Sequence, residues 1–200
     1  MKKLPLALGT GALALALTLT GCATSNQSGS ETSPSTAPES TANAADEMFV
    51  TMMIPHHEQA VEMADIVLGK EGVDAQVAEL AQKVKDAQGP EIDRMLGWLD
   101  DWGVKYDPNG GGMAGMDHGS MDGMGGMMSD ADMTMLKGAD GPSASRMFLE
   151  QMIQHHQGAV KMAETALEGA KNPDVRQLAQ QVIDDQTAEI ATMQDLLTKI

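Results

Sequence analysis

The chain of 200 residues lacks several features on which common protein functions depend. Its single cysteine, Cys22, excludes a disulfide within the chain and any metal site that needs several thiolates. Aromatic residues make up only 2% of the sequence, so a surface on which bases or sugars would stack is not expected. Basic residues are few, 13 against 29 acidic residues, and the net charge of −16 predicts a surface that repels nucleic acids and attracts cations. No segment alternates between apolar and polar residues as a half-buried strand would.

The N-terminus is predicted to be an export signal over residues 1–21. Lys2 and Lys3 precede an apolar run, residues 4–20, that is short for a membrane-spanning helix. The sequence Leu19-Thr20-Gly21-Cys22 resembles the bacterial lipobox, in which the cysteine becomes the lipidated first residue of the mature chain. We therefore expect a lipoprotein anchored through Cys22, on the outer face of the cytoplasmic membrane or in the periplasm. An ordinary secretory peptide with an incidental cysteine is the alternative.

Residues 22–45 are rich in Ser, Thr, Pro and Ala and predict a flexible tether. The rest of the chain, residues 46–200, has the length of one domain with one sizeable core. Removal of the signal takes away two lysines and no acid, which moves the net charge of the mature chain from −16 to −18.

A duplicated segment dominates this domain. Residues 48–64 read MFVTMMIPHHEQAVEMA and residues 147–163 read MFLEQMIQHHQGAVKMA, and together they hold four of the five histidines. The duplication continues, because VAELAQKV at 77–84 matches VRQLAQQV at 175–182. The apolar residues of these segments recur at helical spacing, and glycines or a proline interrupt them.

The duplication predicts two helical hairpins packed into an all-α, four-helix bundle. The expected helices span 46–69 and 73–102 in the first repeat (46–102), and 143–169 and 173–200 in the second repeat (143–200). The linker between them, 103–142, is expected to contain a short helix whose N-cap is Ser129.

The histidine pairs are the first candidate metal ligands. Met53 is the i−3 neighbour of His56 and the i−4 neighbour of His57, so one helix can present all three side chains together. The second repeat offers the same set in Met152, His155 and His156, and Met52 is a further candidate without a counterpart. Imidazole and thioether are ligands that suit soft or borderline ions such as copper. The alternative interpretation is that these residues are simply part of the apolar stripe that faces the core.

Polar residues also interrupt the apolar stripe of each second helix. Gln88 and Glu91 continue the stripe of the first repeat, and Gln186 and Glu189 that of the second. Inward-facing polar groups destabilise a bundle unless they have partners. We expect them to accept hydrogen bonds from the histidines of the same hairpin or to lie beside the metal. The alternative is that the stripe drifts to the surface at these positions.

The linker carries thioethers on a glycine-rich backbone. Residues 103–128 contain nine glycines and six methionines, a composition that is not expected to form a helix or to pack into the core. Thioethers at this spacing suit Cu(I), although a disordered spacer with incidental methionines is the alternative. The candidate ligands are Met113, Met116, His118, Met121, Met124 and Met127.

The segments MIPHHEQAVEMA and MIQHHQGAVKMA, each followed by Gln-x-x-Glu-Ile, resemble a bacterial family, domain of unknown function 305. The resemblance implies a ferritin-like fold. Exported members of the family are associated with copper binding and copper tolerance. This association implies that His56, His57, His155, His156 and nearby methionines bind copper. Pro55 stands where the second repeat has Gln154, so a kink before His56 is expected.

Three functions are compatible with the sequence. The leading one is a non-catalytic lipoprotein that binds Cu(I) or Cu(II) for buffering, tolerance or delivery to a copper-handling protein partner that the sequence does not identify. The second is a ferritin-like metal oxidase. Ferritin-type sites use Glu-x-x-His, however, and Met53 and Met152 stand where that glutamate would be. The third is a metal-free helical interaction module.

Overall fold

The computed structural model describes residues 42–107 and 125–200. In these ranges the chain forms helices and no strand. The helices are α1 (Ala44–Leu68), α2 (Ala75–Asp101), α3 (Asp130–Gly138), α4 (Gly141–Gly169) and α5 (Pro173–Leu197). The predicted signal, Cys22, most of the tether, and the candidates Met113, Met116, His118, Met121 and Met124 lie outside the described residues. None of the described helices is long and apolar enough to cross a membrane.

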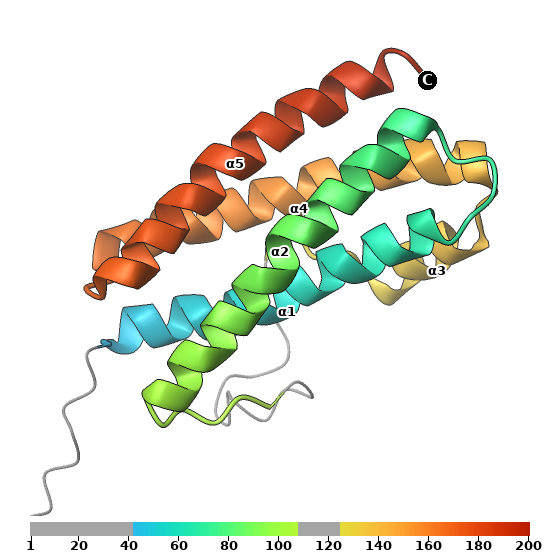
Figure 1. Cartoon of the computed structure of the whole chain (residues 1–200). Coiled ribbons are helices and arrows are strands. Elements are labelled where there is room, and N and C mark those ends of the chain that lie inside the picture. The colour runs from blue at the N-terminus through green and yellow to red at the C-terminus, as the bar shows by residue number, and fades with distance from the viewer. Residues whose placement is uncertain (1–41, 108–124) are drawn as a thin grey trace, which may run out of the picture. The chain divides into compact units, whose positions relative to one another are not determined.

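The helices form two hairpins, α1 with α2 and α4 with α5, and the hairpins meet through α1 and α4 (Figure 1). The prediction of an all-α bundle built from two repeated hairpins is therefore confirmed. The short α3 packs against α1 and α4, near the end of α1 (Figure 1). Ser129 caps α3 in a capping box with Asp132, as the sequence predicted. Helix α1 runs through Pro55 without interruption, so the expected kink does not break it.

Two related contacts fix the ends of one hairpin to the other. Asp46 is fully buried at the start of α1, and its carboxylate accepts backbone N–H groups from Lys171 and Asn172, just before α5. Ser145 occupies the equivalent place on α4, and its hydroxyl accepts the N–H of Asp74 before α2 at 3.0 Å. The first helix of each repeat therefore holds the N-cap residue of the second helix in the other repeat, Asn172 of α5 or Asp74 of α2.

Buried apolar side chains form two clusters. One cluster joins the C-terminal half of α1 to the N-terminal half of α4, and the other joins the remaining halves, so α1 and α4 run antiparallel. On all four long helices a buried polar position separates the residues of one cluster from those of the other. We call the side chains at these positions the polar layer; its buried members are His56, His57, Gln88, His155, His156 and Gln186.

The glycine-rich linker packs more extensively than its composition suggested. Residues 125–128, which we call the strap, lie against α1 and α4. The side chain of Gln59 donates to the Met128 carbonyl at 2.9 Å and accepts the Met128 N–H at 2.7 Å, and Met128 packs on an apolar cluster. At the start of the linker, Val104 and Tyr106 pack on the other cluster. The expectation that residues 103–128 stay outside the core is therefore wrong at both ends.

Candidate metal centre

The four histidines of the two repeats lie in the polar layer, and all four are fully buried. His56 comes from α1 and His155 from α4, and their ring centroids are 3.8 Å apart with the planes tilted by 42°. Equivalent residues of the two repeats therefore meet where the hairpins pack together. His155 also lies near His156 of its own helix, with 6.3 Å between the ring centroids.

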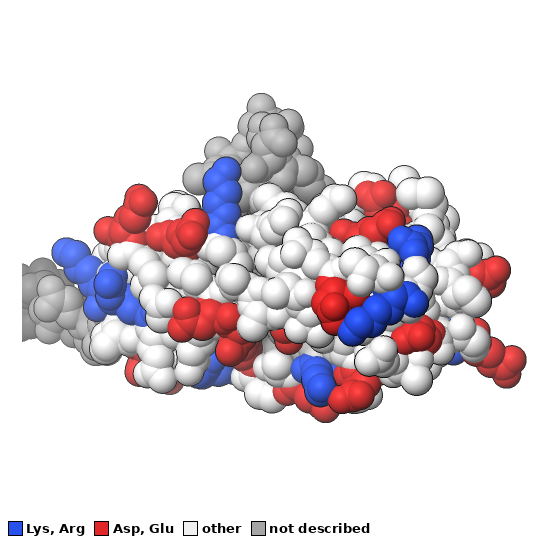
Figure 2. All heavy atoms as spheres, turned by 90° about the horizontal axis from the view of Figure 1, so that it is seen from above, with Lys and Arg blue, Asp and Glu red and all other residues white. Residues whose placement is uncertain are grey.

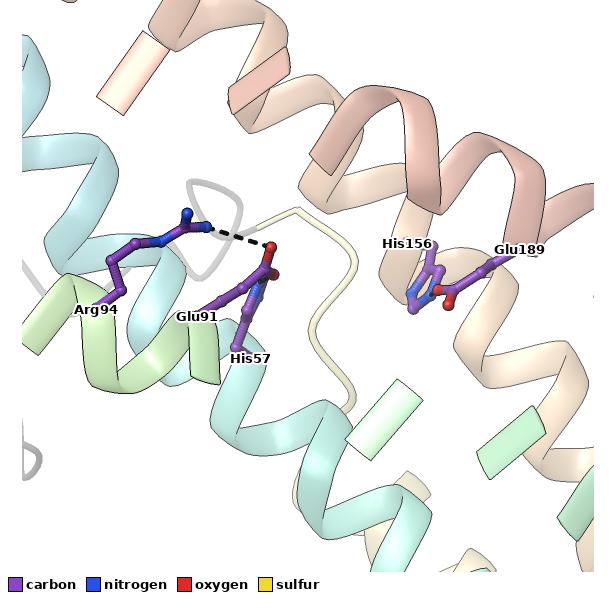
Figure 3. Close-up of polar contacts among 5 residues, drawn as sticks. All are labelled: His57, Glu91, Arg94, His156 and Glu189. Atoms are coloured by element: carbon purple, nitrogen blue, oxygen red, sulfur yellow. Dashed lines mark hydrogen bonds and ion pairs between the residues drawn. The ribbon is translucent and has the colours of Figure 1, made fainter. Parts of the chain in front are cut away.

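His57 and His156 point toward the second helix of their own hairpins (Figure 3). Nε2 of His57 lies 2.9 Å from Oε2 of Glu91, and Nε2 of His156 lies 2.6 Å from Oε2 of Glu189. The two carboxylates are therefore partners of the histidines, one of the two arrangements expected from the sequence. Arg94 approaches the other oxygen of Glu91 at 3.6 Å (Figure 3).

Most ring nitrogens in the polar layer have no hydrogen-bond partner. Nδ1 is buried and unpartnered on all four histidines, and Nε2 of His155 is unpartnered as well. Nε2 of His56 has only the Gly125 carbonyl of the strap, at 3.4 Å. A buried polar atom without a partner costs about 1–3 kcal/mol, so this layer carries an unusual concentration of destabilising groups.

Burial keeps the two central histidines neutral. It lowers the pKa of His56 to about 3, with a further contribution from the nearby His57. It also places the pKa of His155 well below the usual value, and the adjacent His56 lowers that pKa further. At neutral pH both rings therefore offer lone pairs, and the neutral imidazole is the form that binds metal ions.

The methionine candidates lie in different surroundings. Met53 and Met152 are fully buried, one turn before the histidine pairs on α1 and α4. Met52 and Met127 are half-buried. Within residues 42–107 and 125–200, no three side chains of His, Cys, Asp or Glu come close enough to share one ion. Among these residues, Met53 and Met152 are the thioethers nearest along the chain to the His56–His155 contact, where one of them could act as a third ligand.

Two parts of this region were not anticipated from the sequence. One is the strap, which brings the Gly125 carbonyl to His56 and passes over Gly158 of α4. The repeat itself held a signal, because Gly158 stands where the first repeat has Gln59, and both positions contact the strap. The other is a pocket between α2 and α5, lined in part by Gln88 and Gln186.

Comparison with solved structures gives similar folds. A DUF305 fragment from Deinococcus radiodurans is 32% identical, with a TM-score of 0.68 over 80% of this chain and 99% of the other. A DUF305 protein from Streptomyces coelicolor, thought to be secreted, is 34% identical, with a TM-score of 0.67 over 78% of this chain and 91% of the other. CopM in its Cu(II)-bound form is 30% identical, with a TM-score of 0.63 over 77% of this chain and 96% of the other. CopM has also been solved in Cu(I)-bound and Ag-bound forms.

A search among curated proteins finds no match. The model of the family described as "Domain of unknown function (DUF305)" matches residues 46–197. This match includes all five helices except the first two residues of α1, and with them both histidine pairs. The chain therefore belongs to the DUF305 family.

Proposed function

We propose that this protein binds copper outside the cytoplasm and holds it at the contact between His56 and His155. The observation that carries the proposal is the set of buried, unpartnered ring nitrogens at this contact. An ion bound by them would satisfy groups that otherwise destabilise the fold. The neutral state of both rings supports the same role.

The donor set fits copper better than a harder ion. Imidazole nitrogen and thioether sulfur are ligands that Cu(I) accepts, whereas Mg²⁺ and Ca²⁺ require oxygen. His56 and His155 would supply the nitrogens, and Met53 or Met152 the sulfur. The similarity to CopM, which has been solved with Cu(I), Cu(II) and Ag, supports this assignment.

Glu91 and Glu189 would orient the outer histidines. A carboxylate that accepts the Nε2–H of an imidazole leaves the lone pair on Nδ1, and Nδ1 is the unpartnered atom on both rings. His57 and His156 are therefore held in the tautomer that can bind an ion through Nδ1. Gln88 and Gln186 are not among the ligands that we propose for the ion at this centre.

The proposed role is binding without catalysis. A ferritin-type oxidase needs several carboxylates on its metals. The two carboxylates at the polar layer, Glu91 and Glu189, are each already paired with a histidine. We further propose that the lipobox anchors the protein through Cys22 and that the linker methionines collect Cu(I) for buffering, tolerance or delivery to a copper-handling partner. The strong negative charge suits the attraction of cations; on the face in Figure 2, acidic and basic side chains are interspersed.

Metal analysis of the full chain purified without a histidine tag tests the proposal. Copper supports it, iron would favour an oxidase, and no metal after incubation with copper would favour the interaction module. Titration with Cu(I) against a competing chelator then gives the affinity. Met152→Leu should weaken the tight binding, whereas Met135→Leu, at a methionine on α3 that is 53% exposed, should not. If Met53→Leu and Met152→Leu both bind copper as tightly as Met135→Leu does, no thioether is a ligand at this centre.

A further inference from the structure

A pocket between α2 and α5 borders the polar layer, since Gln88 and Gln186 of that layer belong to its lining. Both hairpins contribute to it at equivalent positions, since Gln88 and Glu91 correspond to Gln186 and Glu189. Its lining residues are Ala87, Gln88 and Glu91 from α2, and Val182, Asp185, Gln186 and Glu189 from α5. The glutamates that line this pocket are the ones that contact His57 and His156.

The lining of the pocket favours cations. Glu91, Glu189 and Asp185 contribute carboxylates, and no lysine or arginine belongs to the lining. Arg94 contacts Glu91 from one turn further along α2. Side-chain exposures of 21% for Glu91 and 23% for Glu189 mean that each carboxylate reaches solvent while it holds a buried histidine.

The two glutamines supply a separate indication of a ligand. Gln88 and Gln186 are 3% and 4% exposed, and Oε1 of each is buried without a hydrogen-bond partner. An amide oxygen in this position can accept a cation or one of its water ligands. Because the two oxygens come from equivalent places in the repeats, the pocket offers the same oxygen donors on both walls.

The strap closes a different approach to the histidines. The Gly125 carbonyl lies at His56, and a Cβ placed on Gly126 would come within 2.6 Å of the Gln154 carbonyl oxygen. Backbone therefore packs against α4 there without space for a side chain. His56 and His57 point about 100° apart around α1, so the strap covers one side of the layer and the glutamates face another.

We propose that the pocket between α2 and α5 is the entrance through which a metal ion reaches the buried histidines, and that its oxygen donors hold the ion in transit. The inference rests on the proposed copper binding. Asp185 and the glutamates attract the hydrated cation, and the amide oxygens of Gln88 and Gln186 replace part of its water shell. The ion then passes from oxygen to the imidazole nitrogens behind the glutamates.

Stopped-flow kinetics test whether the negative charge of the pocket speeds the entry of the ion. Cu(II) binding by the full chain is monitored through the quenching of tryptophan fluorescence. Asp185→Lys should slow association about fivefold or more at low ionic strength, and less at high salt. Asp184→Lys is the matched control, because Asp184 is the adjacent exposed acid, changes the net charge equally and does not line the pocket. Equal slowing by the two variants would show that the pocket is not the route by which the ion enters.

A steric variant tests the same route without a change of charge. Ala87→Phe fills the pocket from α2, and should slow both association and chelator-driven release while the equilibrium affinity stays within about twofold. Ala191→Phe, at an exposed alanine of α5 outside the lining, should change neither rate. Unchanged rates in the Ala87 variant, with its fold intact by circular dichroism, would show that the ion enters elsewhere.

The two proposals fail in different ways. If the wild-type chain binds no copper at the histidines, both are wrong. If it binds copper and His56→Gln abolishes that binding, while the Asp185 and Ala87 variants behave like their controls, only the entrance is wrong.

Discussion

Replacing Gly158 with alanine tests whether the strap is seated on α4 as described. A Cβ at this position would lie 1.6 Å from the carbonyl oxygen of Gly125 and 2.8 Å from Cα of Gly126. Both are backbone atoms, which cannot rotate away as the end of a side chain can. The strap must therefore lift from α4 in this variant.

The expected cost follows from the contacts that are lost. Lifting the strap breaks two hydrogen bonds between Gln59 and Met128, at 2.9 and 2.7 Å, each worth about 1 kcal/mol. Exposing the half-buried Met128 side chain adds about 1 kcal/mol. Alanine in a helix interior contributes about 1 kcal/mol of stability relative to glycine. The net loss is therefore about 2 kcal/mol in the free energy of unfolding.

Thermal denaturation followed by circular dichroism measures this loss. For a domain of this size, about 2 kcal/mol corresponds to a melting temperature lower by about 4–8 °C. Gly97→Ala is the matched control, since a Cβ on this exposed glycine of α2 would meet nothing within 4 Å. The control should melt slightly higher than wild type. If Gly158→Ala also melts higher, the strap does not lie on α4 and the reasoning is refuted.

Four further outcomes are expected. Asp46→Ala should lower the free energy of unfolding in urea by about 3 kcal/mol, because the N–H groups of residues 171 and 172 lose their buried acceptor; the exposed first-turn acid Asp174 provides a control. His56→Ala and His155→Ala should each weaken copper binding at least as much as loss of an orienting partner, about 10- to 100-fold, while the helix content stays; unchanged affinity with a much lower melting temperature would make them structural. Deleting residues 111–124 should lower the number of Cu(I) ions bound but leave melting almost unchanged, because the strap is retained; a large fall in stability would show that the deleted segment packs. The free energy of unfolding should fall by about 2 kcal/mol between pH 7 and pH 5 through His56 alone.

The sign of the pH effect follows from the pKa values. The pKa of His56 is about 3 in the folded protein and 6.5 when the ring is free. Below pH 6.5 the unfolded chain therefore takes up a proton that the folded chain does not, and stability falls as the pH falls toward 3. Urea titrations of wild type and His56→Gln at both pH values check this, since the variant should lose less stability than wild type.

The sequence predicted the parts of this fold that depend on local chemistry. Apolar spacing and N-caps such as Ser129 act within a few residues, so the helices and their breaks followed from the printed chain. The pairing of Glu91 with His57 was also predictable, because both lie in one hairpin and a carboxylate on the inward-facing stripe needs a partner.

The contact between His56 and His155 was not predictable in the same way, since it depends on how the two hairpins pack. Glycine content misled the prediction for the strap. A high glycine content disfavours a helix, because a glycine-rich backbone loses much conformational entropy when it folds. The same glycines also permit close packing of backbone on backbone, such as that of Gly125 on Gly158. The one signal in the sequence was that equivalent positions of the two repeats differ, Gln59 in the first and Gly158 in the second. Both positions contact the strap, which is not part of either repeat.

The position of the His56–His155 contact, between one hairpin and the other, couples two equilibria. An ion that binds both rings stabilises the association of the hairpins by the free energy of its binding, about 2.7 kcal/mol when the free ion is at one hundred times its dissociation constant. By the same linkage, anything that separates α1 from α4 must release the ion. A partner that binds the separated hairpins could therefore release the metal through its contacts with the protein, which must supply this free energy, and would not need a higher affinity for the ion than the histidines have.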